Sequence, residues 1–288
     1  ISIRNMVTVK QDIYDSYYSV LREHKVHTLI HFGSLWCSEW DQDNRMDRQS
    51  SINAVDALIE SCDNSEIQNL IYISSSCVYM PFKHAWKSLT EEDLDPLVSE
   101  KECYELIAEN KLRAFNSDNS HIGLTILRPA TILGPSTSIN NIIESSCWEG
   151  MSFVNSRSIQ FTHEYDFIDA INAGLISNTR GVFNVASNGV IDPRDIREII
   201  GRRIWLLPKV FPFSLTSIIV RLLTFQSLKY HEWSFLKQPI ILATSKLRKH
   251  TGFVPKFTSR DAVVDYLYSN DIKDMNVIVL DGEDSSDG

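Results

Sequence analysis

The fold of this chain is decided by one stretch, Asn69-Leu70-Ile71-Tyr72-Ile73-Ser74-Ser75-Ser76-Cys77-Val78-Tyr79. It begins as a short apolar run rich in β-branched and aromatic residues, which is typical of a strand buried on both faces. The run ends in three serines. In an open α/β sheet, ligands bind outside the carboxyl ends of the strands. The serine hydroxyl groups are therefore expected either to cap a neighbouring helix or to face a ligand.

Helical and strand-like segments alternate on both sides of this stretch. Apolar spacing predicts helices at residues 12–24, 47–62, 98–115, 165–176, 244–250 and 259–268, and strands at 6–9, 26–33, 123–129, 159–162 and 181–186. A further helix is predicted to open at Asp192-Pro193, with aspartate as its N-cap and proline in its first turn. Because the connections are long enough for crossovers, the pattern predicts an α/β fold with a doubly wound parallel sheet.

The composition excludes several classes of protein. The 288 residues carry a net charge of −9, which argues against a nucleic-acid surface, since phosphate binding needs clustered Lys and Arg. The five cysteines are odd in number and include no CxxC pair, which favours reduced thiols and a cytoplasmic location over a disulfide framework. The Cys and His spacings predict no metal site.

The longest apolar region, residues 204–225, leaves two interpretations open. It is interrupted by Pro208, Lys209, Pro212 and Arg221, so its apolar core is far shorter than the ~20 residues that a transmembrane helix needs. It predicts either a pair of helices in a substrate-binding region or a weak contact with a membrane surface. The tail ends in an acidic run, and residues 271–288 are expected to be disordered.

With these segments placed, the chain resembles the extended short-chain dehydrogenase/reductases, the NAD-dependent epimerase/dehydratase family. The matching blocks, in chain order, are residues 26–31, 72–79, 127–135, 161–166, 182–187, 244–248 and 251–255. The resemblance implies a Rossmann-like cofactor domain at 1–135 and a smaller α/β substrate-binding region at 136–270. Residues 159–187 are expected to return to the Rossmann-like core.

The family's glycine-rich phosphate-binding turn has no counterpart here. Such a turn opens a helix so that backbone N–H groups approach a pyrophosphate. None of the eleven glycines lies within three residues of another. We therefore expect the chain to be truncated at its N-terminus, before the strand that carries this turn.

The resemblance implies a catalytic hydroxyl and a catalytic lysine. The hydroxyl maps onto Ser75, which would hydrogen-bond the substrate oxygen while its charge changes. Its alternative is a capping role. The lysine maps onto Lys101, whose alternative is a solvated lysine at a helix start. The family's tyrosine lies four residues before the lysine, and this position is Leu97, which has no proton to exchange.

The resemblance also implies NAD or NADP as the cofactor. The family's cofactor-binding positions map onto Asp12, Gly33, Ser34, Ser51, Ser74, Lys101, Arg128 and Pro129, and its substrate-binding positions onto Ser76 and Thr131. Each of these residues has a structural alternative, such as a turn glycine or a surface serine. Arg128, at a predicted strand end, either steadies a phosphate or has a structural role.

These assignments predict an NAD(P)-dependent epimerase or reductase for a nucleotide-sugar-like or other alcohol or carbonyl substrate. A sugar dehydratase is not expected, because Ser76 and Cys77 replace the Asp-Glu pair that dehydratases carry. The alternative is a catalytically impaired scaffold or binding relative, given Leu97 and the absent phosphate loop. The resemblance further implies a homodimer through the helices at 47–62 and 98–115.

Overall fold

The structure is a computed structural model that describes residues 9, 16–33, 45–63, 65–79, 88–94, 103–137, 151–153, 158–200, 205–207, 212–224 and 240–269. The chain divides into two compact units. The first unit comprises residues 1–131, 165–186 and 240–255, and the second comprises residues 132–164, 187–239 and 256–288. The predicted strand at 6–9 and the predicted tail at 271–288 lie outside the described residues, apart from residue 9.

The first unit contains a four-stranded parallel sheet, as predicted. Its strands are β1 (Thr28–Phe32), β2 (Asn69–Ile73), β3 (Gly123–Pro129) and β7 (Gly181–Val185), hydrogen-bonded in that order. The central strand β3 is buried along its whole length, and β2 is buried after its first residue. This burial explains why both strands have nearly continuous apolar sequences.

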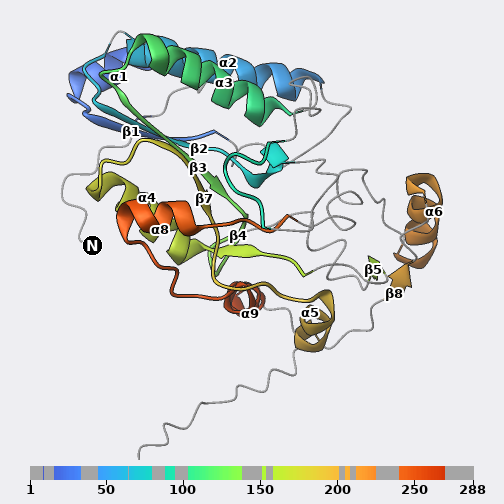
Figure 1. The fold of residues 1–288 in the computed structure, drawn as a ribbon. Coiled ribbons are helices and arrows are strands. Elements are labelled where there is room, and N and C mark those ends of the chain that lie inside the picture. The colour runs from blue at the N-terminus through green and yellow to red at the C-terminus, as the bar shows by residue number, and fades with distance from the viewer. Residues whose placement is uncertain are drawn as a thin grey trace, which may run out of the picture. The chain divides into compact units, whose positions relative to one another are not determined.

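Helices cover both faces of this sheet. Figure 1 shows α2 (Arg45–Asp63) and α3 (Tyr104–Asp118) on one face, and α4 (Glu164–Ile176) and α8 (Ser245–Thr251) on the other. The crossover from β1 to β2 runs through α2, and the crossover from β2 to β3 runs through α3. The first unit is therefore an α/β unit with helices on both sides of a parallel sheet.

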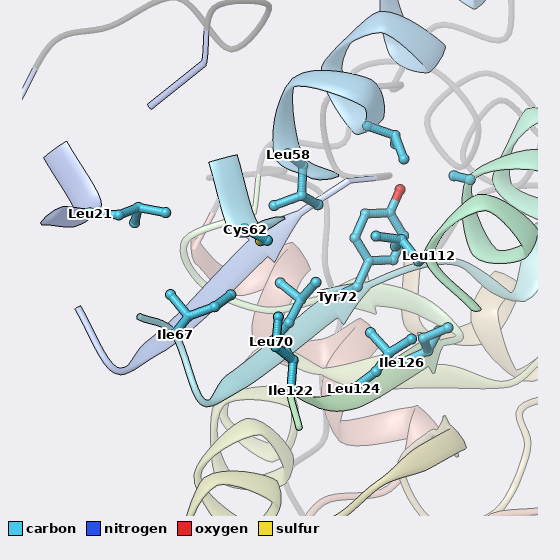
Figure 2. Close-up of a cluster of buried hydrophobic side chains, with 12 residues drawn as sticks. Leu21, Leu58, Cys62, Ile67, Leu70, Tyr72, Leu112, Ile122, Leu124 and Ile126 are labelled. Carbon is cyan, nitrogen blue, oxygen red and sulfur yellow. The ribbon is translucent and has the colours of Figure 1, made fainter. Parts of the chain in front are cut away.

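An apolar cluster fills the space between α2, α3 and the sheet (Figure 2). Its buried members are Leu21, Val55, Leu58, Cys62, Ile67, Leu70, Tyr72, Ala108, Leu112, Ile122, Leu124 and Ile126. Leu21 comes from the short helix α1 (Tyr18–Glu23), which lies within the helix predicted at 12–24. Each buried leucine or isoleucine contributes about 1.5–3 kcal/mol relative to exposure, so this cluster contributes strongly to the stability of the unit.

The helix predicted at 98–115 begins later than the sequence suggests. Cys103 has an extended backbone, with φ −135° and ψ 102°, and α3 starts at Tyr104. The buried side of α3 also differs from the apolar face that the spacing predicts. It consists of Glu105, Leu106, Ala108, Glu109 and Leu112, whereas Ile107 and Phe115 are only half-buried. The difference arises because the carboxylates of Glu105 and Glu109 lie on the buried side, where the spacing predicts only apolar residues.

The second unit contains two small sheets and three helices among the described residues. The sheets pair β4 (Thr131–Leu133) with β6 (Phe161–His163), and β5 (Met151–Phe153) with β8 (Trp205–Leu207). The helices are α5 (Pro193–Ile200), α6 (Phe213–Thr224) and α9 (Ser259–Ser269). His163 Nε2 lies 3.0 Å from Asp265 Oδ2, which attaches β6 to α9.

The helix start predicted at Asp192-Pro193 is confirmed by its capping geometry, and the end of α8 has an equally clear cap. The Asp192 carboxylate accepts a hydrogen bond from the Arg194 N–H at 2.8 Å, and Pro193 is the first residue of α5. Helix α8 ends at Gly252, which has a φ of 73° and donates its N–H to the Arg248 carbonyl at 2.8 Å. Glycine suits this left-handed position because it has no Cβ.

Candidate functional site

The end of β2 places Ser74 and Ser75 in different surroundings. The Ser75 hydroxyl is half-buried and accepts a hydrogen bond from the Cys77 N–H at 3.1 Å. This bond caps the first turn of the short 3₁₀ helix η1 (Ser76–Tyr79). Because the hydroxyl oxygen acts as an acceptor there, its hydrogen remains available to donate, and no acceptor for it lies among the described residues. Ser75 can therefore both cap η1 and donate to a ligand.

Ser74, in contrast, is fully committed to the interior. Its side chain is completely buried and donates to Glu109 Oε1 at 2.7 Å. Glu109 lies on the buried side of α3, one turn after the helix start. The Ser74 hydroxyl therefore links the end of β2 to α3.

Arg128 forms a buried bidentate pair with the same carboxylate. Its Nε donates to Glu109 Oε1 at 2.9 Å, and its Nη2 donates to Glu109 Oε2 at 2.6 Å. Both side chains are completely buried. A buried charge of this kind is tolerated only when it is paired and its donors are satisfied. The pair joins β3 to α3 close to the carboxyl end of the sheet.

The remaining Arg128 donors reach Tyr79 and the segment at 88–94. Nη1 donates to the Tyr79 hydroxyl at 2.8 Å and to the Glu91 carbonyl at 3.1 Å. The Tyr79 hydroxyl in turn donates to Asn184 Oδ1 at 2.7 Å, and the Asn184 N–H donates to Glu91 Oε1 at 2.8 Å. We call Ser74, Tyr79, Glu91, Glu109, Arg128 and Asn184 the buried polar network.

Burial and hydrogen bonding determine the ionisation states of Arg128 and Tyr79 in this network. Burial alone would lower the pKa of Arg128, but the hydrogen bonds and charge of Glu109 outweigh it and raise that pKa above its ordinary value. Burial raises the pKa of Tyr79 to about 12, although the nearby Arg128 and the hydrogen bond to Asn184 oppose the rise. At neutral pH, the network therefore contains a charged guanidinium and a neutral phenol.

The comparisons with known proteins bear on this architecture. The model of the NAD dependent epimerase/dehydratase family matches residues 4–151. This chain belongs to that family. An uncharacterized protein of Mycobacterium tuberculosis is 22% identical over 264 residues, which cover 90% of this chain and 70% of the relative. An uncharacterized protein of Mycobacterium bovis matches with the same identity and coverage.

Solved structures share the fold of the epimerase/dehydratase family with this chain. UDP-glucuronic acid 4-epimerase from Bacillus cereus, in complex with NAD, is 18% identical with a TM-score of 0.63, covering 90% of this chain and 78% of that one. RMD from Pseudomonas aeruginosa, complexed with NADPH, is 15% identical with a TM-score of 0.66, covering 92% of this chain and 88% of that one. At these identities the likeness establishes the fold.

Arg128, Ser74 and Pro129 are three of the cofactor positions that the family resemblance implies. All three side chains are buried within the protein. The Arg128 side chain gives four hydrogen bonds to protein atoms, which supports its structural alternative. Ser74 is bonded to Glu109, and Pro129 is the buried last residue of β3. The geometry therefore offers a cofactor no polar atom from these three side chains.

Gly33, another implied cofactor position, is explained by a neighbouring ring. A Cβ on Gly33 would collide with the Tyr72 hydroxyl oxygen, so a side chain does not fit unless the buried Tyr72 ring moves. The Tyr72 ring also stacks on His31, with centroids 5.6 Å apart. The Nδ1 of His31 is buried and has no hydrogen-bond partner among the described residues. Burial lowers the pKa of His31 to about 4, so the ring is neutral at neutral pH.

The two implied substrate positions are accessible. Ser76 is half-buried at the first position of η1, and Thr131 is half-buried at the start of β4. Asp12, Ser34, Leu97 and Lys101 lie outside the described residues, as does the side chain of Ser51. The helix predicted at 98–115 is not continuous, because Cys103 is extended and α3 begins at Tyr104, and the family assignment of positions 97 and 101 stays a prediction.

The sequence interpretation overlooked three members of the network, namely Glu91, Glu109 and Asn184. One signal was available for Glu109. Together with Glu105 and Leu112 it forms an i, i+4, i+7 stripe, which marks one side of a helix. Both glutamates are buried, and Glu105 Oε2 accepts a bond from the Cys103 thiol at 3.3 Å. No comparable pattern marks Glu91, which lies in a connecting segment.

In the described ranges, a metal site would require a close group of ligating side chains. No group of three or more His, Cys, Asp or Glu side chains there is arranged to hold a metal ion. Cys62, Cys77 and Cys103 form no disulfide with one another. None of the helices that the structure describes is long and apolar enough to cross a bilayer.

Proposed function

We propose that this chain is an NAD(P)-dependent epimerase or reductase that acts on an alcohol or carbonyl carbon of a nucleotide-sugar-like substrate. The observation that carries the proposal is the Ser75 hydroxyl, half-buried at the carboxyl end of β2 with its hydrogen free to donate. Two family structures with this fold are a UDP-glucuronic acid 4-epimerase in complex with NAD and RMD complexed with NADPH.

The described residues fit the reactive end of such a cofactor better than its phosphate end. Ser75 offers a hydrogen-bond donor at the sheet edge where ligands of open α/β sheets bind. Arg128 and Ser74 are already bonded within the protein, so neither is available to a pyrophosphate. When bound, a nicotinamide supplies the acceptor or donor of a hydride at the substrate carbon.

Ser75 acts on the substrate oxygen in this proposal. When a substrate carbonyl carbon accepts a hydride, negative charge grows on the carbonyl oxygen and the Ser75 O–H stabilises that charge by donation; solvent water then protonates the oxygen to give the alcohol. The Cys77 N–H holds the Ser75 oxygen from behind, which fixes the direction of the donor. Ser74 has no such freedom, because its hydrogen is directed at Glu109.

The buried polar network has a positioning role. It joins the ends of β2, β3 and β7 to α3 through Ser74, Arg128, Asn184 and Glu109. A donor is effective only when it is held close to the position of the developing charge, and displacements near 1 Å cost about 10²-fold in rate. The network therefore keeps the peptide that carries Ser75 in one place.

A catalytically impaired binding relative is the second candidate. The geometry of Tyr79 favours it, because this buried phenol is bonded to both Arg128 and Asn184 and is not available for proton transfer. Position 97 is leucine, so the family's tyrosine is missing by sequence. In this case the chain would bind a nucleotide at the same sheet edge without turnover.

Titration with NADH and NADPH, followed by nicotinamide fluorescence, tests whether the chain binds these nucleotides at all. A turnover assay then distinguishes the enzyme from the binding relative. We expect saturable binding and, with NAD⁺ in place of NADH, slow epimerisation of UDP-glucuronic acid or UDP-glucose, because one structural relative is a UDP-glucuronic acid 4-epimerase and another is complexed with UDP-glucose. The variant Ser75→Ala should retain binding and lose about 10²-fold in kcat. The control Ser117→Ala, an exposed hydroxyl on α3, should retain both.

Each other outcome has a definite meaning. Saturable binding of the unsubstituted chain without turnover of any nucleotide sugar identifies the binding relative. Absence of binding to both nucleotides overturns the proposal. Equal turnover by the unsubstituted chain and Ser75→Ala removes Ser75 from the mechanism.

A further inference from the structure

Two cysteines lie close to the Ser75 donor, and the proposed reaction uses neither thiol. Cys77 is half-buried in η1, and its N–H donates to the Ser75 hydroxyl at 3.1 Å. Cys103 is 1% exposed and directly precedes α3. The Cys103 sulfur lies 3.9 Å from the Cys77 carbonyl oxygen. All three residues belong to the first unit, so a single compact unit brings them together.

The position of the Cys103 sulfur leaves only a short gap to the Cys77 side chain. A carbonyl oxygen lies about 2.4 Å from its own Cα, so this sulfur is within about 6 Å of the Cys77 Cα. Disulfides join residues whose Cα atoms are about 4.4–6.8 Å apart, so closure calls for rotated side chains and a small approach of the backbone. Neither residue lies inside a long helix or strand, because η1 has four residues and the Cys103 backbone is extended.

Burial determines which of the two thiols reacts first. Burial raises the pKa of Cys103, and the charges of Glu105 and of a Cys77 thiolate raise it further. Cys77 is more accessible, so an oxidant reaches its thiol first. The buried Glu105 carboxylate accepts a hydrogen bond from the Cys103 thiol at 3.3 Å. Glu105 can therefore take the Cys103 proton when that sulfur attacks.

We propose that Cys77 and Cys103 are a peroxide-sensitive thiol pair, in which disulfide formation moves Cys77 and breaks its N–H bond to Ser75. Hydrogen peroxide oxidises the Cys77 thiol to a sulfenic acid and releases one water. The Cys103 sulfur then attacks the sulfenic sulfur, its proton passes through Glu105 to the departing hydroxide, and a second water leaves. The peroxide is thereby reduced to water, and the two thiols are oxidised to one disulfide.

The disulfide acts on the candidate site through Ser75. The Cys77 N–H fixes the direction of the Ser75 hydroxyl, and a displacement near 1 Å costs a catalytic donor about 10²-fold in rate. This loss of turnover rests on the proposed function, whereas formation of the disulfide does not. The disulfide and the Cys77 amide are therefore measured directly.

Peptide mapping of the full chain by mass spectrometry, before and after treatment with hydrogen peroxide, tests for the disulfide. We expect the chain to lose two hydrogen atoms and to give a peptide pair that joins Cys77 to Cys103, which dithiothreitol separates. In Cys103→Ser, Cys77 has no partner thiol and should instead gain two oxygen atoms as a sulfinic acid, which dithiothreitol does not reverse.

A matched variant controls for the removal of a buried thiol. Cys62 is completely buried in the apolar cluster, so Cys62→Ala should form the disulfide between Cys77 and Cys103 as the unsubstituted chain does. Circular dichroism and a thermal melt verify that both variants fold.

Hydrogen exchange of the peptide that carries Cys77 tests the effect on Ser75. In the reduced chain the Cys77 amide is bonded to the Ser75 hydroxyl, which protects it from exchange. Oxidation should speed the exchange of this amide by at least about tenfold. The peptide of β3, residues 123–129, should exchange at an unchanged rate.

Three results overturn the proposal. The first is a Cys77 that peroxide leaves unmodified, or converts to a sulfinic acid, without a bond to Cys103. The second is a disulfide that joins Cys77 to Cys37 or Cys147 instead. The third is a disulfide between Cys77 and Cys103 that leaves exchange of the Cys77 amide unchanged. Absence of nucleotide binding overturns the proposed function alone, because none of these measurements uses a nucleotide.

Discussion

On the sheet face that α2 and α3 cover, Leu70 of β2 lies beside Leu124 of β3, whereas Ser74 and Arg128 follow at the carboxyl ends of the same two strands. The alternation along each strand keeps all of these side chains on one face. Helix α3 matches this change in polarity along the strands, because Leu112 belongs to the apolar cluster and Glu109, one turn earlier, belongs to the polar network. One layer therefore has an apolar end and a polar end.

The difference between the two ends shows how this fold separates stability from positioning. The apolar end gains free energy from area removed from water and tolerates changes of shape. The polar end gains little net free energy from its buried ion pair, because desolvation opposes the Coulomb attraction. It instead fixes where the strand ends lie, because each hydrogen bond has one acceptable geometry. The proposed Ser75 donor lies beside the polar end.

The largest expected effect is at the polar end. Arg128→Met leaves the completely buried Glu109 carboxylate without its bidentate partner and should lower the free energy of unfolding by about 3–5 kcal/mol. Urea denaturation measures this loss. Adding Glu109→Gln removes the uncompensated charge and should recover about 1–2 kcal/mol.

Arg113→Met is the matched control for that experiment. Arg113 donates to the same Glu109 oxygen at 3.0 Å, but its side chain is 41% exposed. Its removal should cost less than about 1 kcal/mol, because water screens the pair. Equal losses in Arg113→Met and Arg128→Met would refute the view that burial makes the difference.

At the apolar end, Leu112→Ala should cost about 3 kcal/mol. Leu112 is completely buried in the apolar cluster, and the cost combines lost burial with the cavity that remains. The same urea measurement applies. Ile176→Ala, at an 86% exposed position on α4, should change stability by less than about 0.5 kcal/mol. A loss at Leu112 as small as at Ile176 would contradict the proposed packing.

The smallest effect concerns His31, a titratable ring that stacks on Tyr72 of the apolar cluster. The pKa of His31 is lowered by burial from 6.5 to about 4, so the unfolded chain binds this proton more readily than the folded chain. The contribution of His31 is therefore complete above about pH 6.5, and about 2.5 kcal/mol of it is lost by about pH 4.5. His31→Phe should remove that part of the acid sensitivity.

The comparison is made by unfolding each protein in urea at neutral pH and near pH 4.5. His121→Gln, a change at an exposed histidine, should retain the acid sensitivity of the unsubstituted chain. If His31→Phe loses as much stability in acid as the unsubstituted chain does, the ring is not protected by burial.

The periodicity of the sequence was sufficient to predict the parallel sheet, since residues 69–73 and 123–129 are nearly continuous apolar runs of the kind typical of strands covered on both faces. Capping residues such as Asp192 and Gly252 can also be recognised from sequence, because a helix cap depends on residue types next to the helix end. The start of α3 was not, because the helical pattern of 98–115 continues through Cys103 while the backbone does not.

The candidate site depended on contacts that no local pattern contains. Ser74 and Ser75 are identical in sequence terms, and only the position of Glu109, 35 residues later, distinguishes the committed hydroxyl from the free one. The choice between a phosphate-binding and a structural Arg128 was likewise open until its donors were located.

The sequence by itself determined which segments are strands and helices, which family they belong to and which residue types reach the sheet edge, because periodicity and order along the chain are local properties. Only the tertiary structure decided how those polar groups pair. Hydrogen bonds act over about 3 Å in space, and the partners that satisfy Arg128, namely Tyr79, Glu91 and Glu109, come from three separate segments of the chain.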